Sequence, residues 1–329
     1  MELSIIVVNW NSVAYLRKSL QSIYHTTAGV DFEILVVDNA SFDGCGAVVA
    51  TEFPNVRFIQ SGENVGFARA NNIGFQHAQG KNILFLNPDT EVVGSAILEL
   101  VSNLNSLPDA GAVSARLLNA DGSPQVSCIQ PFPTILNQIF DLEFLERRFP
   151  GWWGLRPLFH DGGAAEVEAV SGACLMVKRE IFERVGMFSE DYFMYAEDVD
   201  LCYKIKRAGA KVYHIPTAQL LHYGGGSAKE HPMDSLEIVL TRECTFRFFE
   251  KVRGKMYAGL YRTSLGLVSL FRLAGIFTLI LLARTRLLKT DRQLSNVAKK
   301  WSSLLSWSLG GERWTQTLFE KSTSEATGK

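Results

Sequence analysis

Strand-like apolar runs alternate with helical periodicity over the first ninety or so residues of this chain. The runs are short and rich in β-branched residues, and they lie at 3–8, 32–38, 56–59 and 82–87. Helical spacing of apolar residues occurs between them, at 13–24 and 67–78. Because strands that alternate with helices form parallel sheets through right-handed crossovers, we predict an α/β domain with a mostly parallel central sheet.

Polar residues gather where each of these runs ends. They are Asn9, Asn11, Asp38, Asn39, Ser41, Asn64, Gly66, Asn87 and Asp89. In open parallel sheets the ligand crevice lies outside the carboxyl ends of the strands, so these side chains are expected to converge there. Residues of these types also make ordinary turns. Recurrence after four successive strands favours a site.

Asp89 follows the buried run that ends in "FLNPDT". The Asn-Pro-Asp-Thr sequence is a good turn, which is the structural alternative. A carboxylate beside an amide at a strand end can also bind a hard divalent cation, Mg²⁺ or Mn²⁺, that holds substrate phosphates. His222 is the candidate second ligand because it follows an apolar strand and precedes the glycines of "LLHYGGG".

Glu197 and Asp198 stand at the start of a predicted helix in "YAEDVDLCYKIKRAG". Acidic residues there cap a helix and complement its dipole, which is a sufficient structural reason for both. The preceding segment "FSEDYFMY" is aromatic and apolar, and a carboxylate held against such a wall can serve as a proton acceptor.

The middle of the chain loses its periodicity from about 108 to 165, where we predict an insertion with some helix on the acceptor side. A strand running into a short helix is predicted over 167–186, and a strand at "KVYHI" that ends at Pro216. The globular domain is expected to cover residues 1–230.

The C-terminal region is basic. Residues 247–300 hold twelve Lys or Arg against two acidic residues, a net charge of +10 in a chain whose overall charge is -1. Residues 256–288 are largely apolar, but a spanning helix would place Arg272 near its middle, which is costly. We therefore predict that residues 231–318 form helices lying on a membrane surface. The alternative is a helical subdomain packed on protein. Residues 319–329 are expected to be disordered.

These segments together resemble the family 2 glycosyltransferases, in particular their rhamnosyltransferase-like branch. The resemblance is carried by "IIVVNWN", "ILVVDNASFDG", "ENVGFARANNIGF", "FLNPDT", "SGACLMVKRE", "FMYAEDVDLCYKIKRAG" and "LLHYGGGS", across residues 3–227. It implies a GT-A type, Rossmann-like fold and an inverting transfer of a sugar from a nucleoside diphosphate to an acceptor hydroxyl.

The resemblance also implies roles for single residues. Asn9, Asp38 and Asn39 would hold the nucleoside, and Asn64, Gly66 and Asn71 would line the nucleotide cleft. Asp89 corresponds to the second acid of the family's Asp-x-Asp motif, which binds the metal, and His222 to a histidine that ligates it in some members. Asp198 corresponds to the catalytic base, with Glu197 beside it. Asn87 stands where many members have the first acid of the motif, so the identity of the metal is left open.

The resemblance and the basic region together imply a metal-assisted rhamnosyltransferase that uses dTDP-rhamnose and a glycan or polyprenyl-diphosphate-linked acceptor. A UDP-sugar donor, galactofuranosyl or glucosyl, is the alternative within the class. A catalytically silent nucleotide-binding scaffold is the alternative outside it. An oxidoreductase is disfavoured because no G-x-G-x-x-G follows the first strand. Nucleic acid is disfavoured as a partner because the basic region is so apolar.

The compartment is predicted from the cysteines and the N-terminus. The five cysteines are an odd number without metal-type spacing, as expected in a reducing compartment. The N-terminal sequence "MELSIIVVNWN" lacks the features of a secretion signal. We therefore expect a cytoplasmic protein on the inner face of the inner membrane, with the oligomeric state, a homo-oligomer included, left open.

Overall fold

The chain forms two compact units. The computed structural model describes residues 1–140, 162–224, 234–284 and 292–311. Of these, the first unit contains 1–132, 162–193 and 197–224, and the second contains 133–140, 194–196, 234–284 and 292–311. The predicted domain boundary at residues 230 and 231 and the predicted disordered tail lie outside the described residues.

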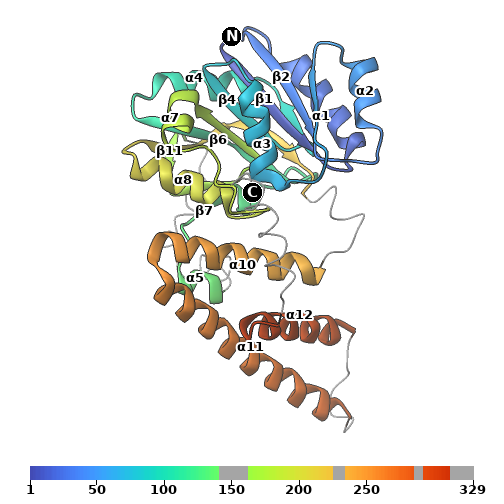
Figure 1. Cartoon of the computed structure of the whole chain (residues 1–329), viewed down its shortest axis with the longest axis vertical. Helices are drawn as coiled ribbons and strands as arrows, with labels where there is room; N and C mark the ends of the chain where they lie inside the picture. Colours follow the sequence, from blue (N-terminus) through green and yellow to red (C-terminus); the bar gives the residue numbers. More distant parts are fainter. Residues whose placement is uncertain (141–161, 225–233, 285–291, 312–329) are drawn as a thin grey trace. The chain divides into compact units, whose positions relative to one another are not determined.

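The first unit is an α/β structure built on a nine-stranded sheet, with its helices packed against the sheet (Figure 1). The strand order is β3-β2-β1-β4-β10-β6-β11-β5, with β8 paired to β11. The elements of this unit, in chain order, are β1 Leu3–Asn9, α1 Val13–Thr26, β2 Phe32–Asp38, α2 Cys45–Glu52, β3 Arg57–Gln60, α3 Gly66–His77, β4 Asn82–Leu86, β5 Thr90–Val93, α4 Ala96–Ser106, β6 Ala110–Leu118, η1 Val126–Cys128, β7 Ile129–Gln130, β8 Ala165–Val167, β9 Ala169–Val170, β10 Cys174–Lys178, α7 Arg179–Arg184, α8 Glu197–Arg207 and β11 Lys211–His222.

The strands β1, β2, β3 and β4 pair in parallel, and so do β6 and β11. All seven residues of β1 are buried, which explains why its sequence is a continuous apolar run rather than an alternating one. The predicted α/β class with a mostly parallel sheet is confirmed.

Strand β10 is antiparallel to both of its neighbours, β4 and β6. Its first residue, Cys174, pairs with Leu86, the last residue of β4. The loop that precedes β10 therefore reaches the carboxyl end of β4, where Asn87 and Asp89 follow.

The prediction of an insertion from about residue 108 was wrong over its first part. Ala110–Leu118 forms β6, a buried strand inside the sheet between β10 and β11. Its sequence, "AGAVSARLL", is rich in small residues and contains Ser and Arg, so it lacks the β-branched signal of the earlier strands. The later part of the predicted insertion, residues 141–161, lies outside the described residues.

The predicted end of the last strand at Pro216 was also wrong. Strand β11 continues to His222 by way of an irregularity between Ile215 and Gln219, whose partners on β6 are the adjacent residues Ala115 and Arg116. A proline is tolerated at such a bulge because the ladder hydrogen bond that it cannot donate is already interrupted.

The second unit is helical. It contains α5 Ile135–Ile139, α10 Asp234–Arg253, α11 Lys255–Arg284 and α12 Arg292–Ser308. Trp307 of α12 is buried, and its indole N–H donates to the Glu243 carboxylate at 2.9 Å. The Arg262 guanidinium lies 4.9 Å from the Trp307 ring and donates to the Trp307 carbonyl at 2.6 Å. These contacts join α10, α11 and α12.

Within the described residues, one helix is long and apolar enough to cross a membrane by length and composition. It is the stretch Lys255–Ile280 of α11, with a mean hydropathy of 1.7. Only 17% of its most apolar part is buried within the protein.

His214 is a buried histidine on β11. Its side chain is 0% exposed, and neither ring nitrogen has a hydrogen-bond partner among the described residues. Burial, and then the nearby Arg116 charge, lowers the pKa of His214 to about 4. The imidazole is therefore neutral in the folded protein at pH 7.

We predict that His214 makes the fold sensitive to acid. The unfolded chain binds a proton at His214 from about pH 6.5 downwards, whereas the folded chain binds it only near pH 4, so stability falls as the pH drops through this window. The free energy of unfolding is measured by urea denaturation at several pH values. Between pH 6.5 and 4 it should fall by about 3 kcal/mol less in a His214→Leu variant than in the wild type. Parallel stability profiles for the two proteins would show that His214 plays no such part.

Candidate active site

Asn9 and Asp38 meet at the carboxyl ends of β1 and β2, where they are paired in register. The Asn9 amide donates to Asp38 Oδ1 at 3.0 Å and to the Ser41 hydroxyl at 3.1 Å. Asn9 Oδ1 accepts from the Ser12 hydroxyl at 2.9 Å. The two predicted nucleoside-side residues therefore form one hydrogen-bonded cluster with Ser41, one of the polar residues expected at the strand ends, and with Ser12, which the sequence did not single out as a binding residue.

The Asp38 carboxylate is held in its ionised form. Burial opposes ionisation, but hydrogen bonds from Ser41, Asn9 and Gln60 outweigh it and lower the pKa of Asp38 below its ordinary value. The Gln60 amide donates to Asp38 Oδ2 at 2.8 Å from the end of β3. An anionic acceptor fixed at a strand end suits the N–H and O–H donors of a nucleoside.

The loop after β2 is fixed by Asn11 and Asp43. Asn11 adopts a left-handed φ of 50°, donates from its backbone N–H to Ser41 at 2.9 Å and accepts from the Phe42 N–H at 2.9 Å. Asp43 accepts from the Val13 N–H at 2.8 Å, at the first residue of α1. The loop and the start of the first helix are therefore tied together.

A group of possible metal ligands in this loop is better explained structurally. Atoms of Asp38, Asp43 and Cys45 lie within 4.8 Å of one another. Burial, followed by the charges of the two acids, raises the pKa of the Cys45 thiol to about 12. Asp43 Oδ1 accepts from the Cys45 N–H at 3.1 Å, in addition to its contact with Val13.

Asn39, Asn64 and Gly66 form the second predicted cluster. The Asn39 amide donates to Asn64 Oδ1 at 2.8 Å, and Asn39 Oδ1 accepts from the Val65 N–H at 2.9 Å. Gly66 has a φ of 81°, and a Cβ at this position would collide with the Phe193 carbonyl. The Phe67 N–H donates to that same carbonyl at 2.8 Å. Glycine is required here because α3 begins against the Phe193 backbone.

Asn71, predicted to line the nucleotide cleft, lies within α3. It is 1% exposed, and its amide donates to the Phe67 carbonyl one turn earlier at 3.0 Å. This bond lies within its own helix, and no hydrogen bond from Asn71 to the two clusters above is recorded among the described residues.

Asp89 and His222 are brought together by the antiparallel pairing of β5 with β11, in which Thr90 lies opposite His222. Their Oδ1 and Nε2 atoms are 3.4 Å apart, and the two side chains are 9% and 13% exposed. The Tyr223 N–H donates to the Asp89 carbonyl at 3.0 Å. The pair that the sequence suggested for a metal thus lies on adjacent strand ends.

The geometry of Asp89 and His222 fits a divalent cation. Carboxylate oxygen and imidazole nitrogen are ligands that Mn²⁺ accepts, and neighbouring ligands of a cation with bonds of about 2.1 Å are about 3 Å apart. Asn87 lies two residues before Asp89, and its backbone N–H donates to the Ala173 carbonyl at 3.0 Å. Its position offers a neutral amide rather than a second carboxylate.

Glu197 and Asp198 occupy the first turn of α8, as predicted. Asp198 is half-buried; its Oδ2 accepts from the Gly172 N–H at 2.8 Å, and its Oδ1 accepts from the Val199 N–H at 2.8 Å. Burial raises the pKa of Asp198 above its ordinary value, although these two N–H groups partly oppose the shift. The two hydrogen bonds therefore orient the Asp198 carboxylate, while burial makes it more basic.

Glu197 is more deeply buried than Asp198, at 5% exposed. Its Oε2 atom has no hydrogen-bond partner in the described part of the chain. Burial, followed by repulsion from Asp198, raises the pKa of Glu197 well above its ordinary value. Ionising both of these adjacent carboxyl groups at the same time is therefore unfavourable.

The loop from Ser171 to Ala173, which precedes β10, joins these groups. Gly172 donates to Asp198, while Ala173 accepts from the backbone of Asn87. A Cβ at Gly172 would lie 3.4 Å from the Phe67 ring and 3.5 Å from Asp198 Cβ. The carboxylate on α8, the strand end that carries Asn87 and the start of α3 therefore converge at one edge of the sheet.

The sequence matches the family described as Glycosyl transferase family 2 over residues 4–186, more than half of the chain. The chain is a family 2 glycosyltransferase. The predicted family and enzyme class are therefore confirmed, and the catalytically silent scaffold is disfavoured.

Three known proteins illustrate the relationship. An N-acetylglucosaminyl-diphospho-decaprenol L-rhamnosyltransferase from Mycobacterium tuberculosis is 29% identical and covers 71% of this chain and 80% of its own. A low-salt glycan biosynthesis hexosyltransferase, Agl10, from Haloferax volcanii is 28% identical and covers 67% of each. The structure of a Pyrobaculum calidifontis mannosyltransferase with GDP-Man and Mn²⁺ has a TM-score of 0.59 at 18% identity, over 94% of this chain and 86% of that one. The last likeness concerns the fold.

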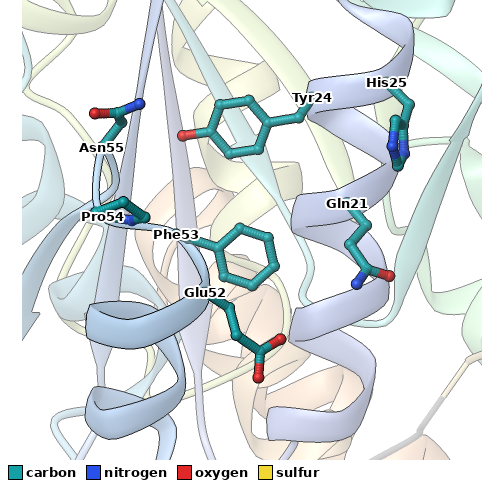
Figure 2. Close-up of a pocket in the computed structure, with 7 residues that line it drawn as sticks. All are labelled: Gln21, Tyr24, His25, Glu52, Phe53, Pro54 and Asn55. Carbon is teal, nitrogen blue, oxygen red and sulfur yellow. The ribbon is translucent and has the colours of Figure 1, made fainter.

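A separate pocket of about 430 Å³ opens in this glycosyltransferase between the C-terminal half of α1 and the loop after α2 (Figure 2). The Tyr24 and Phe53 rings stack across it at 6.3 Å. These residues lie at the end of α1 that leads into the amino end of β2, whereas Asn9 and Asp38 lie at the carboxyl ends. The pocket contains none of the predicted site residues.

Two further contributors to the site, Gly172 and Gln125, were missed in the sequence. Gly172 was part of a predicted strand, but its role depends on the antiparallel placement of β10, which no local pattern specifies. Gln125, in a stretch treated as an insertion, contacts both the ring and the backbone of His222. Only knowledge that Gln125 lies next to His222 in the fold, 97 residues away in the sequence, could have indicated this role.

We predict that Gly66→Ala disrupts the start of α3. The left-handed φ and the collision with the Phe193 carbonyl should together lower the free energy of unfolding by about 2 kcal/mol. The matched control is Gly62→Ala, because a Cβ at Gly62 meets nothing within 4 Å. Chemical denaturation of both variants measures the difference, and equal stabilities would contradict this account of Gly66.

Proposed function

We propose that this glycosyltransferase is an inverting, metal-assisted rhamnosyltransferase. It moves L-rhamnose from dTDP-rhamnose to a hydroxyl group of a glycan carried on a polyprenyl diphosphate. The observation that carries the proposal is the Asp198 carboxylate, half-buried, oriented by two backbone N–H groups and raised in pKa, in a chain of this family.

Asp198 is the proposed general base. It removes the proton from the acceptor hydroxyl as that oxygen forms a bond to the anomeric carbon, and the bond from this carbon to the diphosphate oxygen breaks on the opposite face. The electron pair leaves with the nucleoside diphosphate. A base is most effective when its pKa lies close to the working pH, which is the direction in which burial shifts Asp198.

Asp89 and His222 are the proposed ligands of Mg²⁺ or Mn²⁺. When bound there, the cation would neutralise charge on the departing diphosphate. The support is the 3.4 Å separation of the two ligand atoms on adjacent strands. Asn87 contributes a neutral amide at the position of an acid, so this chain has one carboxylate fewer for the cation than the usual motif.

The nucleoside is proposed to bind where Asp38 and Asn9 meet, with Asn11, Asn39, Asn64 and Gly66 around it. The choice of rhamnose rests on the Mycobacterium tuberculosis relative, whose name gives L-rhamnose as the sugar and a diphospho-decaprenol as the carrier. At 29% identity this supports the sugar and the acceptor class as a proposal.

The α11 helix is proposed to lie on the inner membrane surface. Exposed residues without charge recur at helical spacing along one face of it: Met256, Leu260, Thr263, Leu267, Leu270, Phe271, Ala274 and Phe277. This stripe carries no charge. Arg272 lies off it, with its guanidinium 5.4 Å from the Trp301 ring of α12. A helix that is apolar along one exposed face and basic elsewhere suits anionic lipid, and this supports the proposed location on the cytoplasmic face.

We predict that Asp198→Asn retains donor binding and loses turnover by about 10² to 10⁴. The purified chain is incubated with dTDP-rhamnose, UDP-galactofuranose or UDP-glucose, with and without Mn²⁺, and release of the nucleoside diphosphate is measured. The wild type should release dTDP fastest. The control is Asp31→Asn, whose exposed carboxylate pairs with the N-terminal amine.

Two results would count against this proposal. Normal turnover by Asp198→Asn would remove the base assignment. Faster turnover of a UDP-sugar than of dTDP-rhamnose would replace the donor but leave the base in place.

We predict that Leu267→Ser combined with Phe271→Ser abolishes binding to anionic vesicles. These side chains are 64% and 81% exposed, so the change should remove apolar area from the stripe without opening the core. Flotation with vesicles of phosphatidylglycerol measures binding, with phosphatidylcholine vesicles as the weak-binding reference. Phe42→Ser, an equally drastic change at a side chain 95% exposed in the first unit, is the control. Unaltered flotation of the double variant would favour packing on protein.

A further inference from the structure

The Gln125 side chain forms hydrogen bonds with both the backbone and the ring of His222. Its amide nitrogen donates to the His222 carbonyl at 2.6 Å, and its Oε1 lies 2.7 Å from His222 Nδ1. Gln125 is 9% exposed and sits just before η1, far in sequence from β11. No other described side chain is recorded as bonding to the Nδ1 face of this ring.

The orientation of the Gln125 amide is determined by its surroundings. The His222 carbonyl can only accept a hydrogen bond, so the NH₂ group must face it. The same NH₂ group donates to Asn119 Oδ1 at 3.0 Å. Oε1 is then the atom that faces the imidazole ring, and since it can only accept, Nδ1 must carry the proton.

A short relay supports the same orientation. The Asn119 amide nitrogen donates to the Ser123 hydroxyl at 2.9 Å, and that hydroxyl donates to Asp121 Oδ1 at 2.6 Å. Hydrogen bonds from Ser123 lower the pKa of Asp121, so it is an ionised acceptor. With the direction of each bond fixed from Asp121 onwards, Asn119 Oδ1 is left to accept from Gln125.

The consequence appears at the other ring nitrogen. With the proton on Nδ1, a neutral His222 has its lone pair on Nε2, and Nε2 faces Asp89 Oδ1 at 3.4 Å. Two acceptor atoms facing each other at this separation repel unless a cation lies between them. A ligating histidine commonly donates its other N–H to such an outer partner, which fixes its tautomer and its ring orientation.

We propose that Gln125 is a positioning residue that holds His222 in the Nδ1–H tautomer, so that its Nε2 is directed with Asp89 towards a divalent cation. This inference rests on the metal site of the proposed function. Gln125 touches neither the sugar nor the cation and acts through His222 alone.

The first test needs no variant. The protein is labelled with ¹⁵N-histidine, and the metal-free wild type should give His222 signals with a pyrrole-type Nδ1 and a pyridine-type Nε2. The His222→Ala variant identifies these signals by their loss. The opposite tautomer in the wild type would overturn the proposal, whatever the variants do.

The second test separates positioning from folding. Gln125→Met keeps the length of the side chain but none of its hydrogen bonds, and calorimetric titration with Mn²⁺ should give a Kd about 10- to 100-fold higher than wild type. The Mn²⁺ concentration for half-maximal nucleotide release should rise by the same factor, while kcat at saturating Mn²⁺ returns to the wild-type value. Gln79→Met, at an exposed glutamine before β4, is the control.

The outcomes also distinguish this inference from the metal site on which it rests. If His222→Ala and Asp89→Ala weaken Mn²⁺ binding but Gln125→Met does not, the Gln125 proposal is wrong and the metal site stands. If neither alanine variant weakens it, the metal site itself is misplaced and the Gln125 proposal falls with it.

Discussion

The antiparallel placement of β10 between β4 and β6 is the constraint on which the candidate site depends. Because β10 runs against β4, the residues just before it arrive at the carboxyl end of β4 rather than at the opposite edge of the sheet. Gly172 can then donate to Asp198, and Ala173 can accept from Asn87. A parallel β10 would place this loop at the amino ends of the strands, away from Asp198 and Asn87.

The site carries features that are unfavourable for folding by themselves. Glu197 is buried without a partner for one of its oxygens among the described residues, and Asp198 is partly withdrawn from water beside it. Two non-glycine residues just before α8, Tyr195 and Ala196, have φ values of 75° and 67°. Strain and desolvated acids of this kind tend to collect where a protein needs perturbed chemistry. The buried sheet around them compensates by its apolar burial.

The sequence predicted those strands and helices that are specified by the periodicity of nearby residues. The first four strands and the helices α1 and α3 follow from β-branched runs and helical periodicity, whereas α2 between β2 and β3 was not predicted. The family follows from motifs near the strand ends. Strand β6 was missed because its small residues resemble a loop, and β11 was cut short because Pro216 at a bulge resembles a stop signal. Glu197 and Asp198 could be placed at a helix start, but their burial depends on tertiary packing. The contact of Gln125 with His222 joins residues 97 apart and has no local signature.

Asp43 shows how one side chain can link a loop to a helix. A single carboxylate accepts from the first N–H of α1 and also from the Asn9 amide at 3.3 Å, beside Asp38. The stability of the first turn of α1 and the conformation of the residues at the carboxyl ends of β1 and β2 are therefore not independent. By thermodynamic linkage, any ligand that orders this loop also stabilises the beginning of α1. Any change that frays α1 conversely weakens the binding of such a ligand.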